Sequence, residues 1–265
     1  MKPATLLATL TLGGLFLMTT STTHADSGTS ASAQNVPERP SQTAARTHGG
    51  WTTFRVGGDM QATAVWNERR QQWEADTSAI DTPLPVGYPA PTPPGAIELK
   101  RYPEVRRAEV AGAARSANTG FWPLFRHIER NNIAMTSPVE MDYKPGERHR
   151  LDRTNWRMAF LYRTPELHPT GVDTADQRVE IRDAPALTVL SLGGRGSYDV
   201  TRVEEDLAVL EAWLMDNPEW DAAGAPRALF YNGPSWMPWR KWLEVQIPVT
   251  RTAVGEALAV ASPAE

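Results

Sequence analysis

The stretch that decides the fold occurs twice in the chain. Residues 97–105 read IELKRYPEV and residues 179–187 read VEIRDAPAL, so the second copy starts 82 positions after the first. In each copy apolar and polar residues alternate, a proline interrupts the alternation, and a second alternating run follows. Alternation is typical of a half-buried strand, and the proline indicates a bulge, an edge or a turn. The sequence therefore predicts an internal duplication built on bent strand pairs.

A helical pattern follows each copy. In the first half the apolar residues recur at intervals of three and four: Phe121, Leu124, Phe125 and Ile128. Such a stripe is typical of an amphipathic helix, and we expect Pro123 in the first turn, where proline is tolerated. In the second half the stripe consists of Val203, Leu207, Leu210 and Leu214. There Thr201 and Glu204 predict a capping box at the helix start.

Two more strand patterns follow each helix. They cover residues 139–143 and 156–162 in the first half, and residues 228–231 and 242–249 in the second. A single β-α-β-β unit would leave one face of its sheet bare, so we expect the two units to share one sheet. The sequence therefore predicts an α+β domain made of duplicated β-α-β-β units, with both helices on one side of a curved antiparallel sheet.

The N-terminus differs from this domain. A lysine, an apolar run and a small-residue cleavage site that ends at Ala25 predict a secretory signal peptide over residues 1–25. A membrane anchor that stays attached is the alternative interpretation. Cleavage after Ala25 predicts an exported protein, either periplasmic or secreted, with no stable membrane insertion once the signal is removed.

Between the signal and the domain, residues 26–94 are predicted to form a linker and an N-terminal arm. The linker part is rich in Ser, Thr, Ala, Gln and Pro, a composition that buries too little apolar area to fold. Residues 51–76 suit a short hairpin or an arm packed on the domain, and the recurring prolines of residues 82–94 favour an extended connector. The domain is then expected over residues 95–249, followed by an Ala-rich tail at residues 250–265.

Composition excludes several functions. The formal net charge is −4, so no basic field for nucleic acid or anionic lipid is indicated. The sequence has no cysteine, which excludes disulfides, thiolate metal sites and covalent haem attachment through C-x-x-C-H. It also contains no G-x-S-x-G, H-E-x-x-H or Ser-Lys catalytic pattern. Residues 193–197 read GGRGS, which lacks the spacing of a phosphate-binding loop and favours a tight turn. The sequence therefore does not predict an enzyme.

Several motifs resemble the SOUL haem-binding family. They are GFWPLFRHI at residues 120–128, NNIAMTSPV at residues 131–139, the first strand at residues 97–102, and the closing YNGP and WLEV at residues 231–234 and 242–245. The resemblance spans residues 95–249. It implies a distorted antiparallel barrel of two β-α-β-β repeats. It also implies reversible, non-covalent binding of haem or related tetrapyrroles in a hydrophobic cleft.

The resemblance places this cleft along the first helix and the loop before the last strand. The implied cofactor-binding residues on the helix are Phe121, Leu124, Phe125, Arg126 and His127. Those implied on the loop are Trp236, Met237, Trp239, Arg240 and Lys241. The three cations are candidates to pair with haem propionates, because carboxylates favour arginine and lysine partners. A solvated surface cation is the alternative for each, and the cluster of tryptophans suits a barrel-end core equally well.

The candidate iron ligand is His127. Some members of the family carry a histidine on the first strand, but the matching residue here is Arg101, which has no lone pair to offer iron. His127 could supply an imidazole instead, and the alternative is a helix histidine bonded to solvent or to a neighbouring acid. The leading hypothesis is an exported, non-covalent haem or tetrapyrrole carrier or buffer. The alternatives are a binding module for another small apolar ligand and an enzyme acting on a small molecule in the same cleft.

Overall fold

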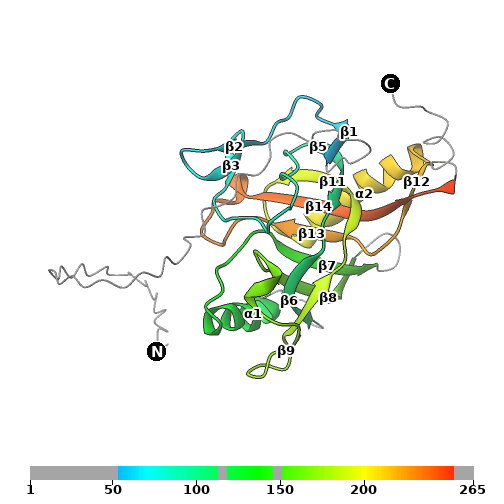
Figure 1. Ribbon diagram of the computed structural model, residues 1–265. Helices are drawn as coiled ribbons and strands as arrows, with labels where there is room; N and C mark the ends of the chain where they lie inside the picture. Colours follow the sequence, from blue (N-terminus) through cyan, green and yellow to red (C-terminus); the bar gives the residue numbers. More distant parts are fainter. Residues whose placement is uncertain (1–52, 113–117, 146–150, 254–265) are drawn as a thin grey trace, which may run out of the picture. The chain divides into compact units, whose positions relative to one another are not determined.

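The computed structural model of the protein describes residues 53–112, 118–145 and 151–253. The predicted signal peptide, the predicted linker before Thr53 and the tail beyond Ala253 lie outside the described residues. The described residues contain one large antiparallel sheet, one small sheet and two α-helices (Figure 1). The helices are α1 (Asn118–Arg130) and α2 (Val200–Asp216).

The strands of the first half are β1 (Thr53–Gly58), β2 (Val65–Asn67), β3 (Gln72–Ala75), β4 (Ser78–Ile80), β5 (Ala96–Tyr102), β6 (Val105–Gly112), β7 (Val139–Pro145) and β8 (Leu151–Leu161). The strands of the second half are β9 (Gly171–Val172), β10 (Glu180–Ala184), β11 (Leu187–Arg195), β12 (Trp220–Ala222), β13 (Arg227–Phe230) and β14 (Trp242–Arg251). Two short 3₁₀ helices lie at Pro165–Leu167 and Pro238–Arg240. The predicted strands are confirmed in both halves.

The large sheet has eleven strands and does not close into a barrel, which confirms the sheet alternative of the predicted fold. Its order is β1-β5-β11-β14-β13-β7-β8-β6-β10-β9, with β12 paired to β14. The two halves use equivalent pairings: β6 with β8 and β7 with β8 in one, β11 with β14 and β13 with β14 in the other. The halves meet where β7 pairs with β13 and where β5 and β6 pair with β11 and β10. This symmetry confirms the duplication.

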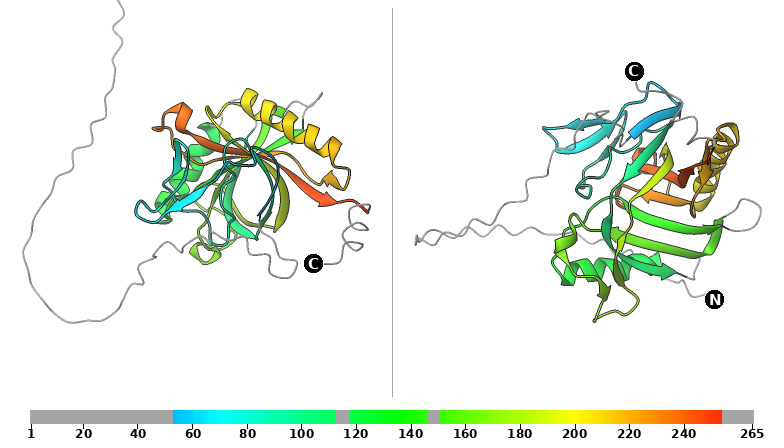
Figure 2. Two further views of the ribbon diagram at one scale, coloured as in Figure 1. Left: turned by 90° about the horizontal axis from the view of Figure 1, so that it is seen from above. Right: turned by 45° about the vertical axis from the view of Figure 1, so that its right-hand side comes forward.

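Both helices pack on one face of the sheet, as predicted. Helix α1 packs on β6 and β8, and α2 packs on β11 and β14. Their buried side chains join the strand residues that point toward them, among them Leu124, Ile128, Val203, Leu207 and Leu210. Figure 2 shows, in its right-hand view, α2 on one side of the strands and the β2–β4 region on the other. The main core therefore lies between the helices and the sheet.

The opposite face of the sheet is covered by the N-terminal part of the chain. Strand β1 pairs with β5, and β2, β3 and β4 form a separate three-stranded sheet. Residues 82–94, named the strap below, follow β4. Trp73, Ile80 and Tyr88 form a second core with side chains of β5, β11, β13 and β14. The arm and the strap are thus packed parts of the fold.

Two local expectations were wrong. Helix α1 begins at Asn118, so Pro123 lies inside the helix rather than in its first turn. Helix α2 is capped by Asp199, whose carboxylate accepts a hydrogen bond 2.9 Å long from the backbone N–H of Arg202. Asp199 is an equally good N-cap in free-energy terms. The side chain of Glu204 instead accepts a bond from the backbone N–H of Leu151, so no capping box with Thr201 forms.

Candidate functional site

A cleft of about 580 Å³ lies on the helix-covered face of the sheet. It is bounded by α1 on one side and by the start of α2 on the other, with β7, β8 and the end of β13 as its floor. Its lining comes from Thr82, Phe121, Phe125, Met135, Thr136, Ser137, Val139, Met141, Tyr143, Trp156, Met158, Tyr198, Asp199, Val200, Phe230, Tyr231, Asn232, Gly233, Pro234 and Lys241. The size falls within the ~300–1,000 Å³ typical of small-molecule sites.

The walls of the cleft are mostly aromatic rings and thioethers. Phe121 and Phe125 lie one helical turn apart on α1, and their rings stack with centroids 5.9 Å apart. Met141 and Met158 are direct cross-strand partners on the floor. Strand residues two apart point to the same face, which is why alternate residues of β7 and β8 reach the cleft. The result is a flat, apolar surface with polarizable sulfur atoms.

Two glycines make room for the largest side chain of the lining. A Cβ at Gly112 would lie 2.2 Å from the ring of Trp156, and a Cβ at Gly120 would lie 2.8 Å from it. No side chain larger than hydrogen therefore fits at Gly112 without moving the indole. Because β6 and α1 pass so close to Trp156, the position of its indole at one end of the cleft floor is fixed.

One group of polar side chains in the cleft lies near the start of α2. The ammonium group of Lys241 lies 5.0 Å from the centroid of the Tyr198 ring, a cation–π distance. The Tyr198 hydroxyl donates to the carbonyl of Trp242 over 2.8 Å and accepts from the backbone N–H of Asn232 over 2.8 Å. Burial raises the pKa of Tyr198. Lys241 is therefore the cation of the lining, held beside a neutral phenol.

His127 does not line the cleft. Its side chain is fully buried behind α1, where Nδ1 lies 2.5 Å from Asp173 Oδ2 and Nε2 lies 2.6 Å from the Tyr162 hydroxyl. Burial lowers the pKa of His127 although Asp173 opposes this. Burial alone would raise the pKa of Asp173, but the N–H of Ala175, His127 and Arg130 hold it at about 2. Both ring nitrogens are thus engaged, and the residue ties α1 to Tyr162, directly after β8, and to the loop at residue 173.

Of the other residues that the family resemblance implies for the cleft, the structure places some in the lining and others outside it. Phe121 and Phe125 line the cleft, as does Lys241 at the end of the loop. Leu124 is fully buried in the core beneath α1, and Arg126 is exposed. The loop residues Trp236, Met237, Trp239 and Arg240 are absent from the lining, and the last three are exposed. The loop reaches the cleft through Gly233 and Pro234 instead.

Comparison with known families decides the identity of the domain. The model of the SOUL haem-binding protein family matches residues 88–248. The chain belongs to the SOUL haem-binding protein family. The match begins inside the strap and ends within β14, so it takes in both repeats and every strand that floors the cleft. No curated protein sequence matches the chain.

Solved structures similar to this SOUL protein share little of its sequence. The C-terminal domain of EcmrR is 16% identical, with a TM-score of 0.48, and the match covers 59% of this chain and 98% of that one. A hydrolase from Listeria innocua is 12% identical, with a TM-score of 0.44, and the match covers 61% of this chain and 94% of that one. At these values neither likeness bears on activity.

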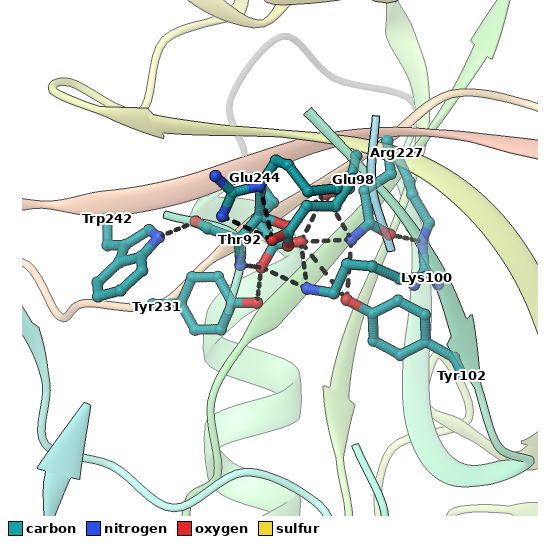
Figure 3. Close-up of polar contacts among 11 residues, drawn as sticks. Thr92, Glu98, Lys100, Tyr102, Arg227, Tyr231, Trp242 and Glu244 are labelled. Atoms are coloured by element: carbon teal, nitrogen blue, oxygen red, sulfur yellow. Dashed lines mark hydrogen bonds and ion pairs between the residues drawn. The ribbon is translucent and has the colours of Figure 1, made fainter. Parts of the chain in front are cut away.

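A second cluster of polar side chains lies on the opposite face of the SOUL domain (Figure 3). At its centre Glu244 on β14 pairs with Lys100 on β5, whose Nζ lies 3.0 Å from both carboxylate oxygens. Both side chains are 0% exposed. Tyr231, Ser191 and Gln246 also donate to Glu244 over 2.6–2.7 Å. Burial alone would raise the pKa of Glu244, but Lys100, the hydroxyls of Tyr231 and Ser191 and the backbone N–H of Thr92 hold it at about 2.

The strap completes this buried cluster. The backbone N–H of Thr92 donates to Glu244 over 2.8 Å, and the indole N–H of Trp242 donates to the carbonyl of Thr92 over 2.8 Å. A Cβ at Gly193 would lie 2.2 Å from the carbonyl oxygen of Pro93, so only glycine allows this approach. The charged groups are directed at one another and at the strap. We therefore assign the cluster to holding the strap on the sheet.

Most of the cleft floor was missed by the sequence reasoning. Tyr143, Trp156, Met158, Tyr198 and Phe230 were not singled out as site residues, although four of them lie on strands predicted correctly or directly at their ends. The signal that finds them is the period-two alternation. Each of the four strand residues occupies the face that points toward the helices, whereas Tyr198 lies between β11 and α2. Across the described residues, no group of three or more His, Asp or Glu side chains is placed to hold a metal ion.

Proposed function

We propose that this SOUL protein binds haem or a related tetrapyrrole non-covalently in the cleft between α1 and α2, as an exported carrier or buffer. The observation that carries the proposal is the cleft itself. It is large enough for a small-molecule ligand, it is walled by aromatic and thioether side chains, and it lies in the domain that the family model matches. A tetrapyrrole is a flat, apolar ring system that carries acidic side chains. The cleft offers apolar walls for the ring and the ammonium group of Lys241 for a carboxylate.

The residues of the cleft fit such a group by apolar contact. Phe121 and Phe125 on one side and Met141 and Met158 on the other would contact the two faces or edges of the macrocycle. Lys241 would pair with a carboxylate of the ligand, because it is the cation at the rim of the cleft. The chain has no cysteine, so no thioether attachment is available. Bound iron would supply the redox and ligand chemistry of haem.

The possible iron donors among the residues that line the cleft argue against His127 as the axial ligand. None of the described residues that line the cleft is a histidine, and His127 uses both ring nitrogens elsewhere. The sulfur atoms of Met135, Met141 and Met158 are the soft donors that the cleft does contain, and thioethers are known axial ligands of haem. We therefore propose binding that depends mainly on apolar contact.

A binding role is favoured over catalysis. The acid that lines the cleft, Asp199, is the N-cap of α2. Glu140 points to the opposite face, where it pairs with Arg107 over 2.9 Å. Among the described acids, Asp206 has a pKa raised by burial, but its carboxylate is held by Arg202 and does not line the cleft. Within the described parts of the chain, no acid is thus placed and tuned in the cleft as a general acid or base would need to be.

The binding proposal is tested by titrating the purified mature protein with haemin and following the Soret band. We expect a saturable, red-shifted band with micromolar affinity. Gly233→Trp is the blocking variant, because Gly233 lines the cleft and a Cβ there meets nothing within 4 Å. Ser235→Trp, two residues away and outside the lining, is its matched control. Saturation in the control and not in Gly233→Trp supports the proposal. No saturable haemin binding by the wild type refutes it, and leaves another apolar ligand or a small-molecule substrate for the cleft.

Export is tested separately. We propose cleavage after Ala25, which removes Lys2 with the signal peptide. Mass spectrometry of the protein recovered from the cell envelope and the medium should find an N-terminus at Asp26. A protein that keeps residues 1–25 in those fractions would support the retained anchor instead.

A further inference from the structure

Helix α1 carries aromatic side chains on its outward face as well as on its buried face. The residues that face the sheet are Gly120, Pro123, Leu124, His127 and Ile128, all buried. On the outward side, Trp122 is 57% exposed and Phe125 is 36% exposed. Their rings meet edge to face with centroids 5.9 Å apart. A surface helix normally keeps its outward face polar, so this pair is not explained by the fold.

The loop before β14 shows the same anomaly. None of residues 233–241 is buried, yet Met237 is 55% exposed and Trp239 is 65% exposed. The loop is nevertheless well held. The 3₁₀ helix Pro238–Arg240 gives it backbone bonds, and Arg240 donates to the carbonyl of Thr77 over 3.0 Å. Its apolar side chains are therefore displayed by an ordered backbone.

The helix and the loop flank the same cleft. Phe125 and Lys241 both belong to its lining. In Figure 1 and in the left-hand view of Figure 2, α1 and the orange loop before β14 lie on the same, left-hand side of the molecule. The two most exposed tryptophans of the described residues, Trp122 and Trp239, thus stand on the two elements that border the mouth of the cleft.

Cations accompany these side chains. Arg126 lies one turn from Trp122 on the outward face of α1, and Arg240 and Lys241 follow Trp239 directly. The chain as a whole has a formal net charge of −4, so these three cations are a local feature of an acidic chain. Exposed tryptophan beside arginine and lysine is the combination that settles at the headgroup level of a bilayer. Anionic lipid headgroups complement these charges.

We propose that the rim of the cleft, formed by Trp122, Phe125, Met237 and Trp239 with Arg126, Arg240 and Lys241, docks on the surface of an anionic lipid bilayer. The proposal rests on the proposed function in one respect: a cleft held against the bilayer would exchange an apolar tetrapyrrole with the membrane without exposing it to water. Docking is peripheral. Among the described residues no helix is long and apolar enough to cross a membrane.

The test is a flotation assay with the ligand-free mature protein and two vesicle preparations, pure phosphatidylcholine and phosphatidylcholine with phosphatidylglycerol. We expect flotation with the anionic vesicles only, and its loss at high salt. The double variant Trp122→Ser/Trp239→Ser should bind at least about tenfold more weakly, because each indole buries a large apolar area. Val172→Ser/Met215→Ser is the matched control, since these side chains are exposed on other elements. Thermal unfolding checks that each variant is folded.

Three results would overturn the proposal. They are no flotation with either vesicle, equal flotation with both, and an equal loss in the control variant. Concentration-dependent dimers that disappear in Trp122→Ser/Trp239→Ser would assign the rim to a second copy of the chain instead. The assay contains no tetrapyrrole, so it is independent of the haemin titration. Flotation without haemin binding would refute the proposed function and leave docking intact.

Discussion

Replacing Lys100 by methionine tests how the buried cluster holds the fold. Lys100 and Glu244 are both 0% exposed, and the ammonium group lies 3.0 Å from each carboxylate oxygen. Lys100→Met keeps the length of the side chain and removes the charge. Breaking a buried ion pair by removing one partner costs about 3–5 kcal/mol, because the other charge is left uncompensated. Lys100 is the largest of the causes that lower the pKa of Glu244 to about 2, so the variant removes the main compensating charge.

The variant should also change how stability depends on pH. In the wild type the pKa of Glu244 is lowered on folding, so the stabilisation is present above its unfolded pKa near 4.5 and is lost as the pH falls toward 2. Without Lys100, burial is left to raise the pKa of Glu244 above its unfolded value. Protonation then relieves the buried charge. The difference in stability between wild type and variant should therefore be smaller at pH 5 than at pH 7.

Urea unfolding followed by tryptophan fluorescence measures both effects. Lys100→Met/Glu244→Gln should recover part of the loss, because the uncompensated charge is gone. Arg70→Met is the control: Arg70 pairs with Glu74 in an exposed i,i+4 pair, and such pairs contribute little. A loss below about 1 kcal/mol for Lys100→Met would refute the reasoning, as would a difference that grows between pH 7 and pH 5.

Three further predictions concern single residues. His127→Gln should lower the unfolding free energy by about 1–3 kcal/mol, because Asp173 and Tyr162 lose a buried partner. The Soret maximum of the haemin-loaded variant should equal that of the wild type, and a shifted maximum would show that His127 is an axial ligand of the iron. Gly193→Ala should loosen the strap, since a Cβ would lie 2.2 Å from the carbonyl oxygen of Pro93; limited proteolysis should then cut residues 82–94 faster, and unchanged protection would contradict the packing. Lys241→Met should weaken haemin binding about tenfold or less, and binding of the haemin dimethyl ester hardly at all; equal losses for both ligands would argue against a carboxylate contact.

The duplicated strands could be predicted from the sequence because their pattern depends on two clearly different faces. In β5, Ile97 and Leu99 face the helices, and Glu98 and Lys100 face the strap. Because Glu98 and Lys100 are charged, the sequence pattern indicated that this face of β5 is exposed to solvent. The structure instead buries it, because the strap covers the face and Glu244 supplies a counter-charge from 144 positions away along the chain. A local sequence pattern cannot show an ion pair between residues so far apart along the chain.

The candidate site was predicted in part. Phe121 and Phe125 belong to the helical stripe and were implied as cleft residues by the family resemblance, and they do line the cleft. His127 lies on the same helix, but its orientation depends on Asp173, a loop residue that no spacing links to it. Asp199, and not Thr201 of the predicted capping box, is the N-cap of α2. Which residue caps the helix depends on the path of the chain from β11 into α2. The contacts of His127 and Asp199 depend on tertiary packing and thus escaped prediction. The strand face that forms the cleft floor follows a local period, but only the fold shows that this face lines a cleft.

The most direct test of the account is the position of the iron in crystals of the haemin-loaded protein, located by anomalous scattering at the iron edge. The account predicts one iron site within the cleft, between Phe121 on α1 and Met141 on β7, with no covalent link to the chain. Iron at a surface histidine such as His168, or against the buried Lys100–Glu244 cluster, or at no defined position, would contradict it.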